Sequence, residues 1–259
     1  MSSIIVIKCG GSTMEQLPPS FFDTLSDLQQ QGKKIVIVHG GGPAINAVLE
    51  KQGIQARFVD GLRFTCEQTM NVVEMVLGGS INKLLVRRLL QASAKAWGMT
   101  GVDAGLIKAK QTERPLGLVG EIVEVQADVL INLVEQGYIP VVAPLGVSED
   151  GKQVFNINAD VAAGSIAAAL QAEKLLMITD VPGILVPQAD GSKVLASKVT
   201  SDEVKEMIAS EVIYGGMIPK VQSALDALQA GVSQVVICKG TNEDLIHAFQ
   251  GGQVGTMIC

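Results

Sequence analysis

The sequence is poor in aromatic residues and in cysteine, and each shortage excludes something. Aromatic side chains make up 3% of the 259 residues, so the interior must be built from Val, Ile, Leu, Ala and Met. Such residues suit parallel strands that are buried on both faces. Cys9, Cys66, Cys238 and Cys259 are far apart and form no CxxC pair, so neither a zinc site nor a disulfide framework is supported. The composition therefore predicts a protein of a reducing compartment, the cytoplasm.

Basic tracts and long apolar runs are also missing. The formal net charge is −6 and no patch combines basic with aromatic residues, which argues against nucleic acid as a partner. No apolar run approaches the roughly 20 residues of a membrane span. The N-terminus does not read as a signal peptide, because the apolar run IIVI at 4–7 is short and Lys8 follows it. We therefore expect no membrane partner either.

Short apolar runs that end in a polar residue or a small loop recur along the chain. They read IIVIKCGG (4–11), IVIVHGGG (35–42), IPVVAPLG (139–146), LLMITDVPG (175–183) and VVICKGT (235–241). Helical spacing of apolar residues marks the segments 20–32, 43–53, 67–97, 127–137, 160–171, 201–209 and 219–231. Gly78 and Gly79 are expected to break or kink the longest of them. Strands alternating with helices predict an α/β fold, an open α/β/α sandwich with a mostly parallel central sheet.

Two further features of the organisation are predicted. Residues 105–126 read as a short β-hairpin. No long linker divides the chain, but a helix-like segment ends and a strand begins near 171–176. We therefore place a boundary between an N-terminal lobe, residues 1–173, and a C-terminal lobe, residues 174–259.

The common nucleotide-binding fingerprints are not met. No G-x-G-x-x-G follows a strand. GVSEDGKQ at 146–153 approaches a P-loop, but Gln153 replaces the Ser or Thr that would bind Mg²⁺. The strand-like VFNIN follows it, where a P-loop requires a helix. We interpret this stretch as a surface turn and Lys152 as a solvated side chain.

Glycines gather where the predicted strands end, which is where ligands bind in α/β folds. HGGGP at 39–43 has three glycines whose amides can approach a ligand closely. Pro43 suits the first turn of a helix, and a helix N-terminus favours anions. A tight turn without a ligand explains this motif equally well on its own, and the same holds for CGG at 9–11. Two such loops at two strand ends together favour an anion site.

Three charged residues lie beside these loops or at helix starts. Lys8 ends the first apolar run, where a lysine can also reach water from a strand end. Asp160 begins an Ala-rich helix, and taken alone it is better explained as an N-cap. Lys220 follows Pro219 at the start of another helix, where an exposed lysine is the alternative. A cation in a first helical turn opposes the helix dipole, which favours a functional reason for Lys220.

Six motifs in order resemble the amino acid kinase family, most closely those members that phosphorylate N-acetyl-L-glutamate. They are IKCGGS, VHGGGP, DGLRFT, NINAD, TDVPGI and GGMIPK, and they span nearly the whole chain. The resemblance implies an N-terminal lobe for the acyl amino acid and dimerisation, and a C-terminal lobe for ATP. The implied reaction transfers the γ-phosphoryl group of ATP, with Mg²⁺ held by phosphates and water, to the side-chain carboxylate. This is the second step of arginine biosynthesis by the acetylated route.

The resemblance also implies roles for individual residues. Lys8 and Lys220 would stabilise the transferred phosphoryl group, and Asp160 would orient both lysines. Residues implied to contact phosphates through their backbone are Gly10, Gly11 and Gly41; those implied to bind the acyl amino acid are Gly41, Gly42, Arg63 and Asn156. Residues implied to line the nucleotide are Asp180, Val181, Gly183, Ile184, Leu185, Val212, Ile213 and Tyr214.

The chemistry of the implied reaction agrees with the composition. Phosphoryl transfer needs positioning and charge stabilisation. A carboxylate acceptor, with a pKa near ~4.3, is already ionised at neutral pH and needs no general base. The chain has only two histidines, and we interpret His39 as structural, while His247 falls in a C-terminal helix.

Two departures from the family pattern affect the interpretation. Members that arginine inhibits carry an additional N-terminal helix that joins dimers into hexamers. Only residues 1–3 precede the first strand here, so the resemblance implies a homodimer that arginine does not inhibit. Phe58, Val59 and Asp60 stand where some relatives carry lysines, so no phosphate-approach role is transferred to them.

Four competing interpretations remain. A family kinase acting on N-acetyl-aminoadipate, free or carrier-linked, differs by one methylene, which changes pocket depth and not motif type. An aspartate kinase would usually add regulatory domains. A non-catalytic nucleotide sensor would not need both Lys8 and Lys220. Finally, the chain could be a plain α/β scaffold whose glycines only make turns.

Overall fold

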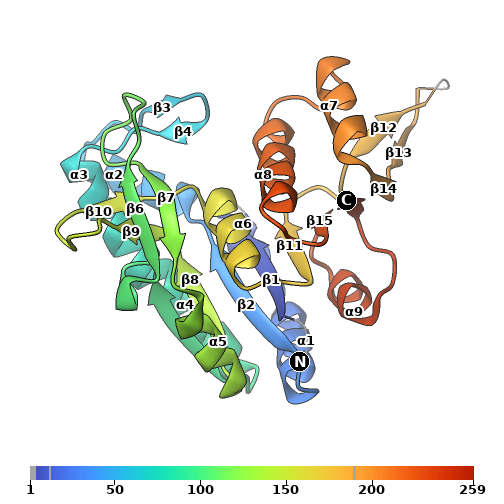
Figure 1. The fold of residues 1–259 in the computed structure, drawn as a ribbon, viewed down its shortest axis with the longest axis horizontal. Coiled ribbons are helices and arrows are strands. Elements are labelled where there is room, and N and C mark those ends of the chain that lie inside the picture. Colours follow the sequence, from blue (N-terminus) through green and yellow to red (C-terminus); the bar gives the residue numbers. More distant parts are fainter. Residues whose placement is uncertain (1–3, 12, 189–190) are drawn as a thin grey trace.

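An eight-stranded sheet runs through the computed structural model, which describes residues 4–11, 13–188 and 191–259 (Figure 1). The expectation of a homodimer that arginine does not inhibit depended on Met1–Ser3, and these residues lie outside the described ranges. In sheet order the strands are β14 (Lys198–Val199), β16 (Thr256–Ile258), β15 (Val235–Cys238), β11 (Lys174–Ile178), β1 (Ile4–Cys9), β2 (Lys34–His39), β8 (Ile139–Ala143) and β5 (Ala96–Thr100). The six strands from β15 to β5 are mutually parallel, and β16 is antiparallel to β15. The predicted mostly parallel sheet is confirmed.

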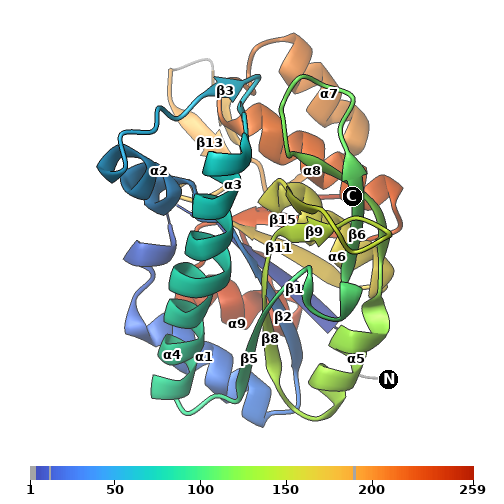
Figure 2. The same cartoon turned by 90° about the vertical axis from the view of Figure 1, so that its left-hand side faces the viewer.

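Helices cover both faces of this sheet, as the side view in Figure 2 shows. One face packs against α1 (Pro19–Gln30), α2 (Gly42–Lys51), α3 (Glu67–Glu74), α4 (Asn82–Gln91) and α9 (Asn242–Gln250). The other packs against α5 (Ala127–Glu135), α6 (Ala159–Ala169), α7 (Ser201–Ala209) and α8 (Met217–Gln229). Along β1, Ile5, Ile7 and Cys9 join the first core and Val6 joins the second, as strand alternation requires. Lys8 shares the side of Val6, which directs it toward α6.

A second, four-stranded sheet begins directly after β8, because β9 follows the carboxyl end of that strand. Its order is β10 (Val154–Asn156), β9 (Leu145–Val147), β6 (Ile107–Gln111) and β7 (Gly120–Val125). β6 and β7 form the predicted antiparallel hairpin. Residues 148–152 are the turn between β9 and β10, and the Lys152 side chain is 83% exposed, so the interpretation of the P-loop-like stretch is confirmed.

Smaller elements complete the described chain. They are the hairpin of β3 (Phe58–Val59) and β4 (Leu62–Arg63), the hairpin of β12 (Leu185–Pro187) and β13 (Lys193–Leu195), and the 3-10 turns η1 (Met14–Gln16) and η3 (Asp103–Gly105). The first hairpin turns at Asp60 and Gly61, which both have positive φ, 49° and 78°.

Two sequence predictions were wrong in extent. The helix expected over 67–97 contains the π-helix η2 (Met75–Ile81), where Gly78 and Gly79 lie, and it ends at Gln91. Ser93 adopts a positive φ of 63° after it, and residues 96–97 already belong to β5. A glycine at this position would have predicted the end of the helix, because glycine favours positive φ; a serine does not. The run 139–146 is divided by Pro144, so that its end joins β9 in the second sheet.

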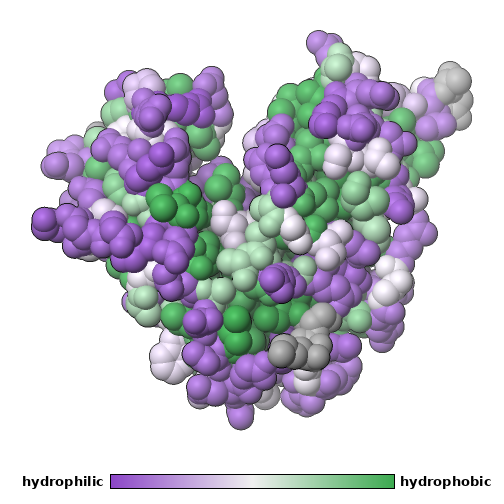
Figure 3. All heavy atoms as spheres, in the orientation of Figure 1, coloured by the Kyte–Doolittle hydropathy of each residue, from purple (hydrophilic) through white to green (hydrophobic). Residues whose placement is uncertain are grey.

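Figure 3 shows the molecule hollowed between two parts, one carrying β3, β4, β6 and β7 and the other carrying α7, α8 and the hairpin of β12 and β13. The predicted boundary at 173/174 precedes β11, yet β11 pairs with β1 over five residues, from Ile5–Lys174 to Cys9–Ile178. The central sheet is therefore continuous across it, and the division into lobes stays a prediction. Within the described ranges, no helix has both the length and the apolar character needed to cross a lipid bilayer.

Candidate active site

Lys8 and Asp160 form an ion pair at the carboxyl end of β1. The Nζ of Lys8 lies 2.7 Å from the Oδ1 of Asp160, and the side chains are only 6% and 14% exposed. The buried Oδ1 receives no hydrogen bond of good geometry from the described residues. An ion pair held out of water is much less screened than a surface pair. The pair is therefore a strong local dipole, and the Oδ1 of Asp160 can still accept a hydrogen bond.

The alternative that Asp160 serves as the helix cap is wrong. The N-cap of α6 is Asn158, whose Oδ1 accepts hydrogen bonds from the amides of Asp160, at 2.8 Å, and Val161, at 3.1 Å. Asn158 was not among the predicted site residues. An asparagine two positions before Asp160 and directly ahead of an Ala-rich run is a recognisable capping signal. The cap leaves the carboxylate of Asp160 available to Lys8.

The two glycine loops touch each other. A Cβ on Gly11 would lie only 2.8 Å from the backbone nitrogens of both Gly41 and Gly42, so no other residue fits there. Among the described residues, no acceptor is found for the amides of Gly41 and Gly42. Helix α2 begins at Gly42, so the positive end of its dipole adds to these amides. The loops form a cradle suited to an anion.

Gly10 has a different environment from Gly11. A Cβ there would meet the Oγ1 of Thr13 at 3.1 Å and the Nζ of Lys8 at 3.7 Å. It therefore lies beside the lysine and leaves room for the ammonium group.

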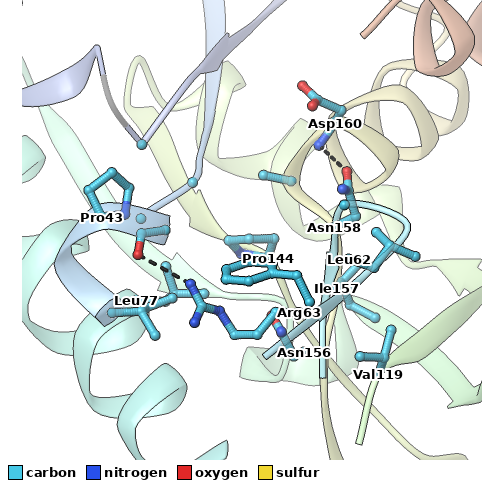
Figure 4. A pocket seen from close by; sticks show the side chains of 18 of the residues that line it. Pro43, Leu62, Arg63, Leu77, Val119, Pro144, Asn156, Ile157, Asn158 and Asp160 are labelled. Atoms are coloured by element: carbon cyan, nitrogen blue, oxygen red, sulfur yellow. Dashed lines mark hydrogen bonds between the residues drawn. The ribbon is translucent and has the colours of Figure 1, made fainter. Parts of the chain in front are cut away.

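A cavity of about 380 Å³ joins these features (Figure 4). Its lining includes Lys8, Asp160, Gly11 and the start of α2, together with Arg63 and Asn156. The side chains of Phe58, Leu62, Leu77, Val119, Pro144 and Ile157 add apolar surface. A small organic acid with an apolar portion fits such a lining.

Arg63 supplies an unsatisfied cation to this cavity. Its Nη2 donates to the carbonyl of Gly42 at 3.2 Å, as Figure 4 shows, and its guanidinium lies 4.8 Å over the ring of Phe58. Among the described residues, no hydrogen-bond partner is found for the buried Nη1, and the residue as a whole is only 8% exposed. Burial lowers the pKa of Arg63, yet a guanidinium stays charged in proteins. A buried donor without an acceptor costs free energy, and a carboxylate is a favourable acceptor because it matches the planar fork of a guanidinium.

Asn156 lies beside Arg63 and is held by its own partner. Its Nδ2 donates to the Oγ1 of Thr65 at 3.0 Å, and that hydroxyl donates to the carbonyl of Arg63 at 3.0 Å. Thr65 is fully buried and was not predicted as a site residue. Its hydroxyl links the two polar residues of the cavity floor.

Lys220 lies in the first turn of α8 and faces the same charges. Burial lowers the pKa of Lys220, and the positive charge of Lys8 lowers it further. The carboxylates of Asp160 and Asp180 oppose this shift, so all four groups share one electrostatic environment. Within the described chain, Asp160 forms an ion pair with Lys8 and none with Lys220.

A separate pocket of about 200 Å³ lies between α8 and the hairpin of β12 and β13. Its lining contains the predicted nucleotide residues Val181, Gly183, Ile184, Leu185, Val212, Ile213 and Tyr214. Lys193 and Met217 also line it, and nothing in their sequence context marked them. Asp180 lies outside this lining and accepts a hydrogen bond from the hydroxyl of Thr179 at 2.9 Å.

Comparison with known proteins agrees with this geometry. The model of the amino acid kinase family matches residues 3–239. An acetylglutamate kinase of Brevibacillus brevis is 60% identical over 258 residues, which cover 100% of this chain and 97% of that relative. An acetylglutamate kinase of Geobacillus kaustophilus is 46% identical over 241 residues, 93% of this chain and 91% of that one.

A solved structure from Streptococcus mutans UA159 has the same fold. It superposes with a TM-score of 0.85 at 34% identity, covering 100% of this chain and 99% of the other. The motifs, the cradle at the strand ends and these similarities lead to one conclusion. The chain belongs to the amino acid kinase family.

Proposed function

We propose that this chain is an acetylglutamate kinase, which transfers the γ-phosphoryl group of ATP to the side-chain carboxylate of N-acetyl-L-glutamate. The product would be N-acetyl-L-glutamyl 5-phosphate. Full-length relatives of that name make the chain a phosphotransferase with a carboxyl acceptor and favour this substrate over N-acetyl-aminoadipate. The structural observation that carries the proposal is the buried Nη1 of Arg63, which has no partner within the described ranges and lies in the cavity that also contains Lys8 and Asp160.

The acyl amino acid would bind with its α-carboxylate on Arg63. A fork-to-fork contact would satisfy the Nη1 that is otherwise unpaired. Asn156, oriented by Thr65, would contact the α-substituents, and the apolar wall that includes Phe58 and Leu62 would receive the acetyl methyl. These contacts would direct the side-chain carboxylate toward Lys8 and the glycine cradle.

Catalysis would depend on placement and on charge. The amides of Gly41 and Gly42 and the ammonium group of Lys8 would stabilise charge on the transferred phosphoryl oxygens. Asp160 would fix the direction of Lys8, and Lys220 would approach from the other side. The acceptor is already a carboxylate at neutral pH, so no residue would have to remove a proton.

ATP would bind with its base and ribose in the 200 Å³ pocket beside α8 and its phosphates near Lys220 and the glycine cradle. Mg²⁺ would arrive with the nucleotide, neutralising phosphate charge while phosphates and water hold it. Lys8 and Lys220 would supply largely buried positive charges to a polyphosphate of this kind.

The residues that line the two pockets come from different parts of the sequence, which supports the two-lobe division. Every residue lining the 380 Å³ cavity precedes 161, whereas the nucleotide pocket is lined by residues from 181 to 217. We therefore assign residues 1–173 to the acyl amino acid and to dimerisation, and 174–259 to ATP. Closure of the lobes would exclude water from an acyl phosphate product.

A homodimer in the cytoplasm is the proposed form. β5 is the last strand of the central sheet, and edge strands offer unpaired backbone groups to a second chain. Trp97 on this strand is 51% exposed and stacks edge-on with Tyr138. Light scattering coupled to size-exclusion chromatography should give the mass of a dimer, and a monomer or hexamer would refute this assignment.

The function is tested by ADP release with ATP, Mg²⁺ and a panel of acceptors: N-acetylglutamate, N-acetyl-aminoadipate, glutamate, aspartate and carbamate. We expect strong turnover with N-acetylglutamate alone, and trapping with hydroxylamine should yield a hydroxamate because the product is an acyl phosphate. A preference for N-acetyl-aminoadipate would support the lysine-pathway alternative. Folded protein with no turnover on any acceptor would favour a nucleotide sensor.

A further inference from the structure

His39 is a fully buried histidine next to the glycine cradle that the proposed mechanism does not use. It is the last residue of β2 and pairs in register with Cys9, so its side chain enters the core between the sheet and α4. It does not line the 380 Å³ cavity. Its side chain therefore touches no substrate in the proposed arrangement.

The hydrogen bonds around His39 determine which ring nitrogen carries the proton. The Nδ2 of Asn82 donates toward the carbonyl of Val141, at 2.8 Å, and that of Met99, at 3.1 Å. The Oδ1 of Asn82 accepts from the Nζ of Lys83 at 3.0 Å, which fixes the orientation of the amide. The Nδ2 also lies 3.2 Å from the Nε2 of His39, and because an amide NH2 group cannot accept a hydrogen bond, it offers a protonated Nε2 no acceptor.

The other ring nitrogen must then be protonated. The Nδ1 of His39 lies 2.9 Å from the carbonyl oxygen of Gly40, and a carbonyl can only accept. Burial lowers the pKa of His39 to about 4, with the charge of Lys83 adding to the shift, so the ring is neutral near pH 7. The imidazole is thus a fixed donor aimed at one peptide group.

That peptide group determines where the amide of Gly41 points. The peptide between Gly40 and Gly41 is planar and trans, so its carbonyl and its N–H point in opposite directions. The carbonyl is held on the α4 side by His39, and the N–H of Gly41 is therefore directed away from α4. On that side, the nitrogen of Gly41 borders the position that a Cβ of Gly11 would fill.

Three consecutive glycines need such a restraint. Residues 40–42 carry no Cβ, so their peptide planes can rotate at little steric cost. An amide N–H that points away from the cradle cannot stabilise the negative charge of a phosphoryl group there. We propose that His39, oriented by Asn82, is a positioning residue that directs the Gly41 amide into the anion cradle through its hydrogen bond to the Gly40 carbonyl. The inference rests on the proposed function, because it assigns that cradle to the transferred phosphoryl group.

Two substitutions at this position separate the positioning role from a packing role. His39→Asn places an amide nitrogen where the Nδ1 was and so keeps a donor for Gly40. His39→Leu has similar volume and no donor. Both variants lose the Nε2 that lies beside Asn82, and they differ in whether a donor to Gly40 is kept; the Gln variant separates this donor from side-chain polarity. His39→Gln, whose amide nitrogen lies further out at the Nε2 position, is a polar substitute for the Leu variant should that variant fail to fold.

We expect His39→Leu to have a kcat lower than that of His39→Asn by about 10- to 10²-fold, as misplacement of a catalytic donor costs. The KM for N-acetylglutamate should change little, because Arg63 is held by a different carbonyl. Equal kcat values for folded Asn and Leu (or Gln) variants would overturn the proposal.

A second measurement does not depend on activity. Long-range ¹H–¹⁵N NMR of the ¹⁵N-histidine-labelled wild type distinguishes the tautomers, and with two histidines the His39→Asn spectrum identifies the signal. A protonated Nδ1 on neutral His39 supports the proposal, and a protonated Nε2 would refute it. If the wild type phosphorylates no acceptor, the proposed function is refuted; the NMR measurement of the His39 tautomer does not depend on that result.

Discussion

Acid should unfold this protein partly through His39. The pKa of this histidine is lowered from 6.5 to about 4 because burial disfavours the charged ring. The unfolded chain therefore binds the proton more readily than the folded chain between these values. The stabilisation is fully present above about pH 6.5 and is lost as the pH falls toward 4. With these two pKa values, acidification from pH 7.5 to pH 5 should cost the folded state about 2 kcal/mol through this residue alone.

The contribution is measured from urea unfolding at the two pH values. The difference in unfolding free energy should be about 2 kcal/mol larger for wild type than for His39→Asn, which cannot take up the proton. Carboxylates that titrate in the same range are common to both proteins and cancel. His247→Asn, which removes the other histidine from the exposed face of α9, is the matched control and should lose as much as wild type. An equal loss in wild type and His39→Asn would show that His39 is not held neutral by burial.

Four substitutions test the site directly. Lys8→Ala should lower kcat by at least ~10²-fold in steady-state assays, whereas Lys152→Ala, on an exposed turn, should not; near-normal turnover without Lys8 would end its proposed role. Asp160→Asn should lower kcat and, by leaving Lys8 buried without its counter-charge, destabilise the fold by about 3 kcal/mol in urea, while circular dichroism shows α6 intact because its cap is separate. Arg63→Ala should raise the KM for N-acetylglutamate by about 10- to 10²-fold, and an unchanged KM would place the α-carboxylate elsewhere. Gly11→Ala should abolish detectable turnover, because its Cβ would lie 2.8 Å from two backbone nitrogens, and a crystal structure would show which loop moves.

Local signals explain what the sequence predicts well. An apolar run followed by glycine is a short-range pattern, and it located the ends of β1 and β2 together with the loops that touch there. The hairpin over 105–126 and the turn before Gln153 follow from the same kind of signal. The order of the strands does not, because β1 pairs with β11 about 170 residues later and no short-range pattern encodes that choice.

The features that sequence reasoning missed depend on contacts between distant residues or on unusual backbone conformations. Thr65 holds Asn156, which lies 91 positions away in the sequence, and Lys193 reaches the proposed nucleotide pocket from a hairpin that carries no motif. The cap at Asn158 is the exception, since its signal was present and a neighbouring aspartate competed with it. The end of α4 was missed because Ser93 takes a positive φ without being glycine.

The alternation of side chains along β1 and β2 places Lys8, proposed to act on the phosphoryl group, and His39, proposed to position a backbone amide, on opposite faces of the sheet. Lys8 pairs with Val38 and Cys9 pairs with His39, so paired positions face the same side of the sheet. Lys8 therefore meets α6, where Asp160 holds it, while His39 meets α4, where Asn82 holds it. Because side chains alternate along a strand, a slip of β1 by one residue would turn Lys8 into the apolar core around α1 and α4 and turn Ile7 toward Asp160. An uncompensated buried lysine would cost several kcal/mol, which is comparable to the stability of a whole domain. The same residues that arrange the cradle thus also exclude the wrong register.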